Sequence, residues 1–174
     1  MRSTARAKAQ SRSLAENLKD LLLQSDVASI VQFHVMYDAA TEHLESFKLS
    51  GAFSALGGGS EDSYGDFKAW IVSQGLTFAN RVRSDPDCLA TLGRLKIDDV
   101  VNEEVQYSAV KAFRKKAGAE FIDVLYKDYC EPEAIRVSIR ESFRGDPVEP
   151  DHDWTKTGDY QEVVPRLFKL YGSS

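Results

Sequence analysis

The residue types that most often carry catalysis are sparse in this chain, and their spacing argues against the common metal sites. The 174 residues include three histidines and two cysteines. His34 and His43 lie nine residues apart in one predicted helix, on opposite sides of its axis, so they cannot share a metal ion if that helix is unbroken. His152 stands between two aspartates in a predicted surface loop, where solvated charges are commoner than a metal ion. We therefore expect neither a metal site nor a cofactor.

Nucleophilic catalysis also lacks its usual sequence signals. The chain contains neither a Gly-x-Ser-x-Gly nucleophile elbow nor a His-Glu-x-x-His zinc motif. Cys88 and Cys130 occur in unrelated local contexts, form no Cys-x-x-Cys pair and have no histidine near them in sequence. We expect both cysteines to be reduced, which is typical of a cytoplasmic protein.

Carboxylates could still form a catalytic site if the fold gathers them in a pocket. Asp62 and Asp66 lie four residues apart on one predicted helix, and Asp38 belongs to another. Acids that line a cavity and have perturbed pKa values are typical of enzyme active sites. A small hydrolase or transferase with an acidic site near Asp62 and Asp66 is therefore one alternative for the function.

Three arginines are the best candidates for contact with an acidic partner. If residues 135–144 form a helix, Arg136, Arg140 and Arg144 recur every fourth residue along one side of it. Arginine makes strong, directional hydrogen bonds to carboxylates and phosphates, although pairing with acids of the chain itself is the more ordinary interpretation of this row. A nucleic-acid-associated protein that uses this row is a second alternative for the function.

The overall charge argues against nucleic acid as the partner. Residues 1–13 carry a charge of +4 and no acid, so a net charge of −5 for the whole chain leaves −9 on the remainder. An acidic body repels nucleic acid. The first thirteen residues lack an apolar core and are expected to form a flexible basic leader. No apolar run approaches the roughly 20 residues that span a bilayer, so no membrane contact is expected.

One stretch organises the rest of the chain. Gly57, Gly58 and Gly59 allow a sharp chain reversal, and the serines and acids that follow can cap a helix beginning near residues 62–64. Gly75 suits the position just after the end of that helix. Tyr64, Phe67, Trp70 and Ile71 fall on one face of the helix and should pack inward. A phosphate site is not expected here, because no Lys-Ser or Lys-Thr pair follows the glycines and Glu61 and Asp62 bring negative charge to the helix start.

The same stretch carries a family resemblance. Gly58-Gly59-Ser60-Glu61-Asp62-Ser63-Tyr64-Gly65-Asp66-Phe67-Lys68-Ala69-Trp70-Ile71-Val72-Ser73-Gln74-Gly75, followed by Asp85-Pro86-Asp87, resembles a bacterial domain-of-unknown-function family, number 4240. Here Glu61 replaces the first Asp of the family's Ser-Asp-Asp, and Lys68 replaces the Arg of its Phe-Arg-x-Trp. Lysine cannot make the two-pronged contact that arginine makes, so the replacements put any shared ion site in doubt.

The resemblance extends more loosely to residues 27–47, 107–118 and 164–168. It implies a helical domain without an established activity, and it carries over no catalytic residue.

Hydrophobic periodicity and helix caps predict most of the remaining elements. The predicted segments are a helix from Ser13 to Ser25, a long central helix from Asp26 to Phe47, a turn at Ser50-Gly51, a short piece at 52–56, short helices near 76–84 and 88–92, helices over 100–117 and 121–129, and a final helix over 160–171. Residues 135–144 fit a helix or a strand, and the rest of the chain favours the helix. Asp87 is expected to cap the turn that follows it.

We therefore predict a mainly α fold: a single-domain, compact bundle of about six to eight helices over residues 14–172, with at most a minor β element around 135–140. The favoured function is a protein-interaction or regulatory module without enzymatic activity. The candidate binding residues form two groups, namely Glu61, Asp62, Tyr64, Asp66 and Trp70 in the first, and Arg136, Arg140 and Arg144 in the second. The expected partner is another protein, because exposed aromatics and charges on a rigid helix suit protein binding.

Overall fold

Helices account for all the regular structure in the described part of the chain. A computed structural model describes residues 14–101, 103–121, 125–143 and 160–172, and no strand occurs in these ranges. The prediction of an α fold is therefore confirmed, and residues 132–142 are helical. The basic leader at 1–13, His152 and Arg144 lie outside the described residues. No helix in the described ranges combines the length and the hydrophobicity needed to cross a membrane.

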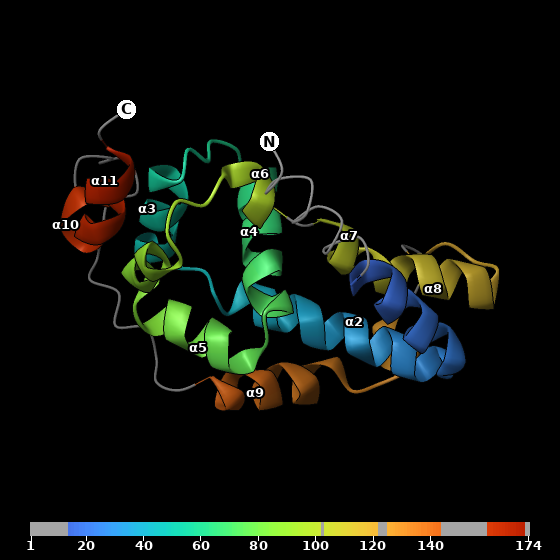
Figure 1. Ribbon diagram of the computed structural model, residues 1–174. Coiled ribbons are helices and arrows are strands. Elements are labelled where there is room, and N and C mark those ends of the chain that lie inside the picture. Colours follow the sequence, from blue (N-terminus) through green and yellow to red (C-terminus); the bar gives the residue numbers. More distant parts are fainter. Residues whose placement is uncertain (1–13, 102, 122–124, 144–159, 173–174) are drawn as a thin grey trace. The chain divides into compact units, whose positions relative to one another are not determined.

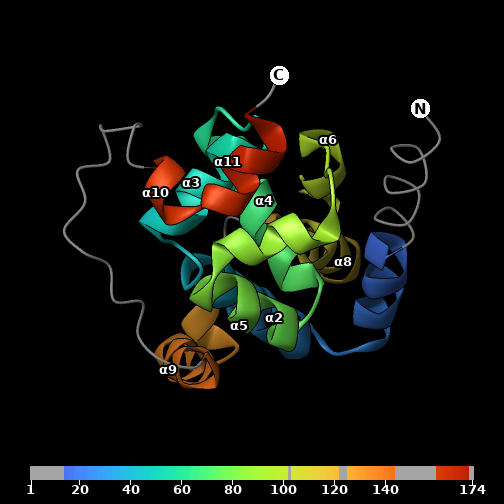
Figure 2. The same ribbon diagram turned by 60° about the vertical axis from the view of Figure 1, so that its left-hand side comes forward.

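The elements follow one another in the order shown in Figures 1 and 2. They are a helix over 14–24, α2 (Val27–Glu42), α3 (Phe47–Ala55), α4 (Glu61–Ser73), α5 (Leu76–Ser84), the 3-10 helix η1 (Pro86–Leu92), α6 (Ile97–Val100), α7 (Glu103–Gln106), α8 (Ser108–Ala117), the 3-10 turn η3 (Tyr126–Asp128), α9 (Pro132–Ser142), α10 (Tyr160–Val163) and α11 (Pro165–Tyr171).

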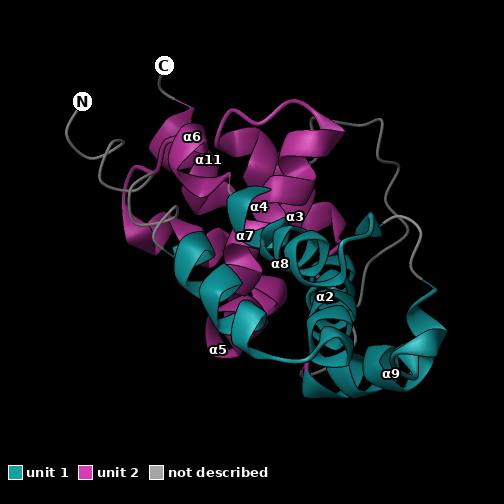
Figure 3. Cartoon of the chain, turned by 90° about the vertical axis from the view of Figure 1, so that its right-hand side faces the viewer, with its two compact units in different colours: residues 1–43, 102–142 teal, residues 44–101, 143–174 magenta. Residues whose placement is uncertain are grey.

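The chain divides into two compact units, and each is built from two separate stretches of sequence. Unit 1 contains residues 1–43 and 102–142, and unit 2 contains residues 44–101 and 143–174 (Figure 3). The predicted single domain over residues 14–172 stays a prediction.

Unit 1 is organised around α2, which packs against α8, α9 and η3. The side chain of Asp26 caps α2 by accepting a hydrogen bond from the Ser29 N–H at 2.7 Å, as the sequence predicts. Lys116, in the last turn of α8, donates hydrogen bonds to the carbonyls of Leu23 and Ser25 at the end of helix 14–24. The positive charge of Lys116 thus lies at the negative end of a neighbouring helix and stabilises it. The buried cluster of this unit consists of Leu22, Ile30, Val31, Ala109, Ala112, Phe113 and Phe121.

Unit 2 contains the glycine-to-tryptophan stretch, and its main features are as predicted. Ser60 caps α4 by accepting from the Ser63 N–H at 3.2 Å, and Phe67 and Ile71 are buried. Gly57 and Gly75 have φ values of 88° and 94°, a region that favours glycine, and they bracket the helix. Gly58 is held against the ring of Phe53 so closely that a Cβ atom would lie 2.3 Å from it.

The region around Gly51 is a helix, so the predicted turn at Ser50-Gly51 is wrong. Residues 47–55 form α3, whose start is capped by Ser46. The Tyr160 ring leaves little room for a side chain at position 51, because a Cβ atom there would lie 3.0 Å from Tyr160 Cδ1. The glycine therefore reflects close packing between α3 and α10, which lie side by side in Figures 1 and 2.

Two predicted helices are divided in the structure. The stretch 100–117 contains the end of α6, α7 and α8, because acidic pairs at 98–99 and 103–104 each begin a separate turn and Val101 between them is extended. The final helix breaks at Val164, whose φ and ψ of −135° and 58° are not helical. Pro165 explains this break, since the residue before proline avoids helical angles.

The predicted helix over 121–129 is also wrong. Leu125 is 59% exposed and its backbone is extended, and the turn that follows it is only η3. Phe121 and Tyr126 both contact the ring of His34, and this aromatic packing outweighs the apolar spacing at every fourth residue.

Candidate functional site

The predicted site residues of α4 are divided between helix capping and internal contacts. Glu61 and Asp62 are exposed in the first turn, where their charge suits the positive end of the helix. Tyr64 and Trp70 are half-buried, as is Asp66. The Tyr64 hydroxyl donates a hydrogen bond to the Ser46 carbonyl at 3.3 Å.

The aromatic side chains of α4 pack with those of neighbouring helices. The Trp70 ring stacks on Phe67 with centroids 6.0 Å apart and meets Phe78 of α5 edge-on at 5.8 Å. Lys68, at the position of the family's arginine, forms an ion pair with Glu45 and lies 4.9 Å from the centre of the Tyr64 ring. These contacts join α4 to α5 and to the segment just before α3.

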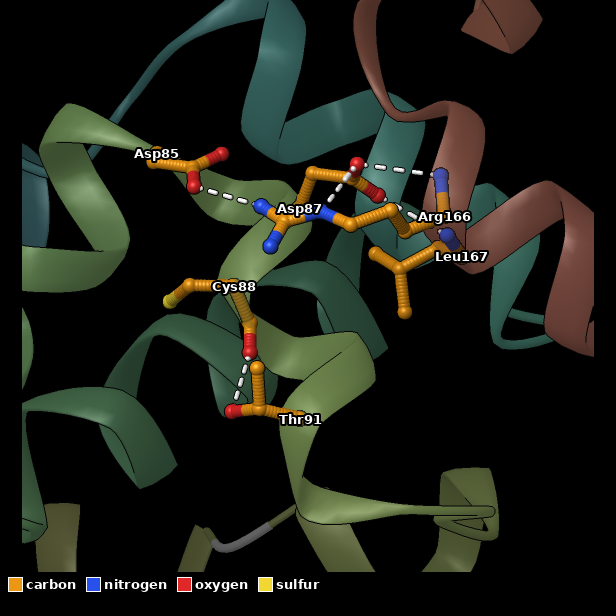
Figure 4. A network of polar contacts seen from close by, with 6 residues as sticks. All are labelled: Asp85, Asp87, Cys88, Thr91, Arg166 and Leu167. Atoms are coloured by element: carbon orange, nitrogen blue, oxygen red, sulfur yellow. Dashed lines mark hydrogen bonds and ion pairs between the residues drawn. The ribbon is translucent and has the colours of Figure 1, made fainter.

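The Asp-Pro-Asp motif builds the most complete polar network in the described residues (Figure 4). Both oxygens of Asp87 accept hydrogen bonds from the start of α11: Oδ2 from the Arg166 N–H at 3.0 Å and from Arg166 Nε at 2.9 Å, and Oδ1 from the Leu167 N–H at 2.8 Å. Arg166 Nη2 donates to Asp85 Oδ2 at 2.6 Å. We call these four residues the Asp-Arg clamp.

The Asp-Arg clamp supplies a helix cap from a distant part of the chain. α11 begins after Val164, which has no side-chain acceptor, so the Asp87 carboxylate takes the place of a local cap. The Asp87 side chain is only 6% exposed. Hydrogen bonds from Arg166 to Asp87 and Asp85 raise the pKa of the Arg166 guanidinium. The prediction that Asp87 caps η1 is wrong, because the carboxylate turns to α11.

Cys88 lies beside the Asp-Arg clamp, but its thiol is not activated as a nucleophile. Burial raises the pKa of the Cys88 thiol, which disfavours the nucleophilic thiolate. The sulfur points away from the Asp87 carboxylate in Figure 4, and the carbonyl of Cys88 accepts a hydrogen bond from Thr91 Oγ1 at 2.7 Å. The geometry of this network suits fastening one helix to another.

The arginine row is only partly free. Arg136 donates to Asp38 Oδ2 at 3.1 Å and forms an ion pair with Glu42, and both acids belong to α2. Partial burial works to lower the pKa of Arg136, but the two acids outweigh it and the pKa is raised. Arg140 is exposed and has no hydrogen-bond or ion-pair partner among the described residues. The row therefore contains one arginine that fixes α9 to α2 and one that is available.

The two flanks of α9 border depressions of different character. One depression, of about 180 Å³, is lined by Ala39, Glu42, His43, Arg136 and Arg140. The other, of about 540 Å³, is mostly apolar and is lined by Gln32, Met36, Tyr129, Cys130, Glu131, Ala134, Ile135, Ser138 and Ile139. Arg136 and Ser138 lie about 200° apart around the helix, so the depressions occupy opposite flanks of α9. Both belong to unit 1, whereas Asp62 and Asp66 belong to unit 2.

The helix α9 itself is unusually accessible for an amphipathic helix. None of its residues is fully buried. Ile135 and Ile139 face α2 and are half-buried, whereas the opposite side carries Glu133, Val137 and Arg140, all exposed. Val137 is 40% exposed. α9 therefore rests on α2 with one side and presents a charged ridge with an apolar centre on the other.

His34 lies inside an aromatic group that the sequence did not indicate. Its ring centroid is 4.6 Å from that of Phe121 and 5.8 Å from that of Tyr126, both edge-on. Burial lowers the pKa of His34, with Asp38 opposing the shift and Arg136 adding to it. Among the described residues, no group of three or more His, Cys, Asp or Glu side chains gathers closely enough to hold a metal ion.

Together these features define an all-α protein whose best-formed polar site fastens helices and whose α9 is exposed. A family model for a protein of unknown function (DUF4240) matches residues 1–115, which is more than half of the chain, so the chain belongs to that family. The resemblance read from the α4 motif is thereby confirmed. No curated protein and no solved structure was found to match the chain. The family match contains α4 and the Asp-Pro-Asp motif and ends before α9 and α11.

Proposed function

We propose that this protein is a protein-interaction module that binds a partner chain through the exposed side of α9. The observation that carries the proposal is the surface of that helix: Val137 stands exposed between Glu133 and Arg140, and no α9 residue is buried. Surfaces that bind proteins commonly combine an apolar centre with a polar rim.

The way α9 is held supports the same proposal. Arg136 joins it to Asp38 and Glu42 of α2, so the exposed side is presented on a helix whose position is set by ion pairs. A preorganised surface loses less conformational entropy on binding. The second predicted surface, on α4, is the weaker candidate because Tyr64 and Lys68 are already engaged within unit 2.

The charge of this surface favours a protein over a nucleic acid. Arg136 is neutralised by two carboxylates, and Glu133 and Glu141 lie on the same exposed side as Arg140. A surface with both signs offers little net attraction to phosphate. It suits a partner that carries both signs as well.

The test places a photoreactive amino acid at Val137 of the full chain in its native cells. The matched control places it at Leu21, an apolar residue that is 62% exposed on another helix of unit 1. We expect a discrete protein adduct from position 137 and none of that mass from position 21. Absence of an adduct at 137, or the same adducts from both positions, would overturn the proposal.

A further inference from the structure

The charges on the exposed side of α9 are arranged so that the helix complements a copy of itself. Successive residues of a helix turn by about 100°, so Val137 can be taken as the centre of the exposed side. Glu133 and Arg140 then lie on one side of Val137, about 40° and 60° around the axis. Ala134 and Glu141 lie at similar angles on the other side. Each edge of the face therefore has its own pair of side chains.

We infer that the partner of this surface is a second copy of the chain, with the two α9 helices antiparallel about a two-fold axis at Val137. The inference rests on the proposed function and names its partner. In this arrangement each edge of one helix faces the same edge of the other. Glu133 is four residues before Val137 and Arg140 is three residues after it, so the two-fold axis brings them to nearly the same height. Glu133 of each copy therefore meets Arg140 of the other, which gives two ion pairs.

The remaining residues of the face fit the same arrangement. Glu141 meets Ala134 of the second copy, so like charges do not oppose each other on that edge. A two-fold parallel pair would instead set opposite edges of the face against each other, so Arg140 would meet Glu141 and Glu133 would meet Ala134, and it would align the helix dipoles unfavourably. The helix dipoles therefore favour the antiparallel pair. Only in that pair does association depend on the charge of Glu133 opposite Arg140.

The size of the contact predicts a weak dimer. α9 has eleven residues, a length of roughly 16 Å, and its exposed face has few apolar side chains. The apolar depression bordered by Met36 and Tyr129 adjoins Ala134 and extends the apolar surface on that edge. Standard stable interfaces bury about 1,600 Å² in total. We expect association at tens to hundreds of micromolar, with dimer and monomer in rapid exchange.

Sedimentation equilibrium of the full chain over a concentration series tests this inference. The apparent mass should rise from 19.4 kDa towards twice that value. Glu133→Arg and Arg140→Glu should each weaken association by at least tenfold, because each replaces both ion pairs by repulsion. An equimolar mixture of the two variants should associate again, because every pair in the mixed dimer is attractive.

Matched controls reverse exposed charges elsewhere in unit 1. Glu16→Arg and Lys115→Glu should associate like the unchanged protein, and circular dichroism should show the same helix content in all variants. A mass that stays at 19.4 kDa up to millimolar concentration contradicts the inference, as does a mixture of variants that remains monomeric. If the chain stays monomeric while position 137 captures a different protein, this inference fails and the proposed function stands.

Discussion

At the scale of single residues, Asp87 has the clearest role in the molecule. Its buried carboxylate accepts three hydrogen bonds from the start of α11, two from backbone N–H groups and one from the Arg166 side chain. A helix start that lacks a local acceptor leaves N–H groups unpaired, and burying them unpaired costs free energy. Asp87 removes that cost and joins η1 to α11.

Replacing Asp87 tests this role. Asp87→Ala should lower the free energy of unfolding by about 2–3 kcal/mol, because it removes a helix cap and leaves Arg166 without its buried partner. Asp87→Asn keeps one acceptor and should cost about half as much. Asp85→Ala removes only an exposed ion pair and should cost less than about 1 kcal/mol. Urea denaturation measures all three, and equal effects at Asp85 and Asp87 would be inconsistent with this account.

His34 should make the stability of the protein depend on pH. Burial lowers its pKa below the ordinary value of 6.5, so the unfolded chain takes up a proton more readily than the folded chain. The free energy of unfolding therefore falls as the pH drops below about 6.5, by at most about 1.4 kcal/mol per pH unit. Denaturation of the unchanged protein and of His34→Gln between pH 7.5 and 5 gives the difference. Parallel pH curves for the two proteins would refute this assignment.

At the scale of elements, the turn before α4 depends on Gly58 more than on Gly59. Alanine at Gly58 would place a Cβ atom 2.3 Å from the Phe53 ring, whereas nothing lies within 4 Å of a Cβ atom at Gly59. We expect Gly58→Ala to lower the free energy of unfolding by about 1–3 kcal/mol and Gly59→Ala to have little effect. Thermal unfolding of the two variants makes the comparison. A larger loss at Gly59 would show that the turn is held differently.

Local signals were sufficient to predict the elements whose ends are set by their own residues. Asp26 and Ser60 cap α2 and α4, and Gly75 follows α4 with positive φ, as the sequence indicated. The failures have tertiary causes. Gly51 reads as a turn in isolation, yet it lies within α3 because Tyr160 packs against it from 109 positions further along the chain.

The candidate sites were predicted less well for the same reason. The partners of the Asp-Arg clamp are about 80 residues apart, and no local pattern joins Asp87 to Arg166. One signal was available: Pro165 begins a helix after Val164, a residue without an acceptor, which implies a cap from elsewhere. On α9 the arginine spacing was correct, but the pairing of Arg136 with Asp38 and Glu42 depends on how α9 packs on α2.

At the scale of the whole molecule, the candidate surfaces belong to different parts of the chain. The Asp-Arg clamp and α4 lie in unit 2, whereas α9 lies in unit 1. The family match ends at residue 115, before α9. A partner that binds α9 would thus contact residues outside the matched segment, while the α4 motif that carries the resemblance takes part in internal packing.

The most direct measurement compares α9 with α4 as the binding surface. The same photoreactive amino acid is placed at Val137 or at Asp62, an exposed position on α4 within the predicted binding group. The yield of protein adducts is measured for the full chain in its native cells. Our account predicts a discrete adduct from position 137 and little from position 62. Adducts that form at position 62 and not at position 137 would contradict it.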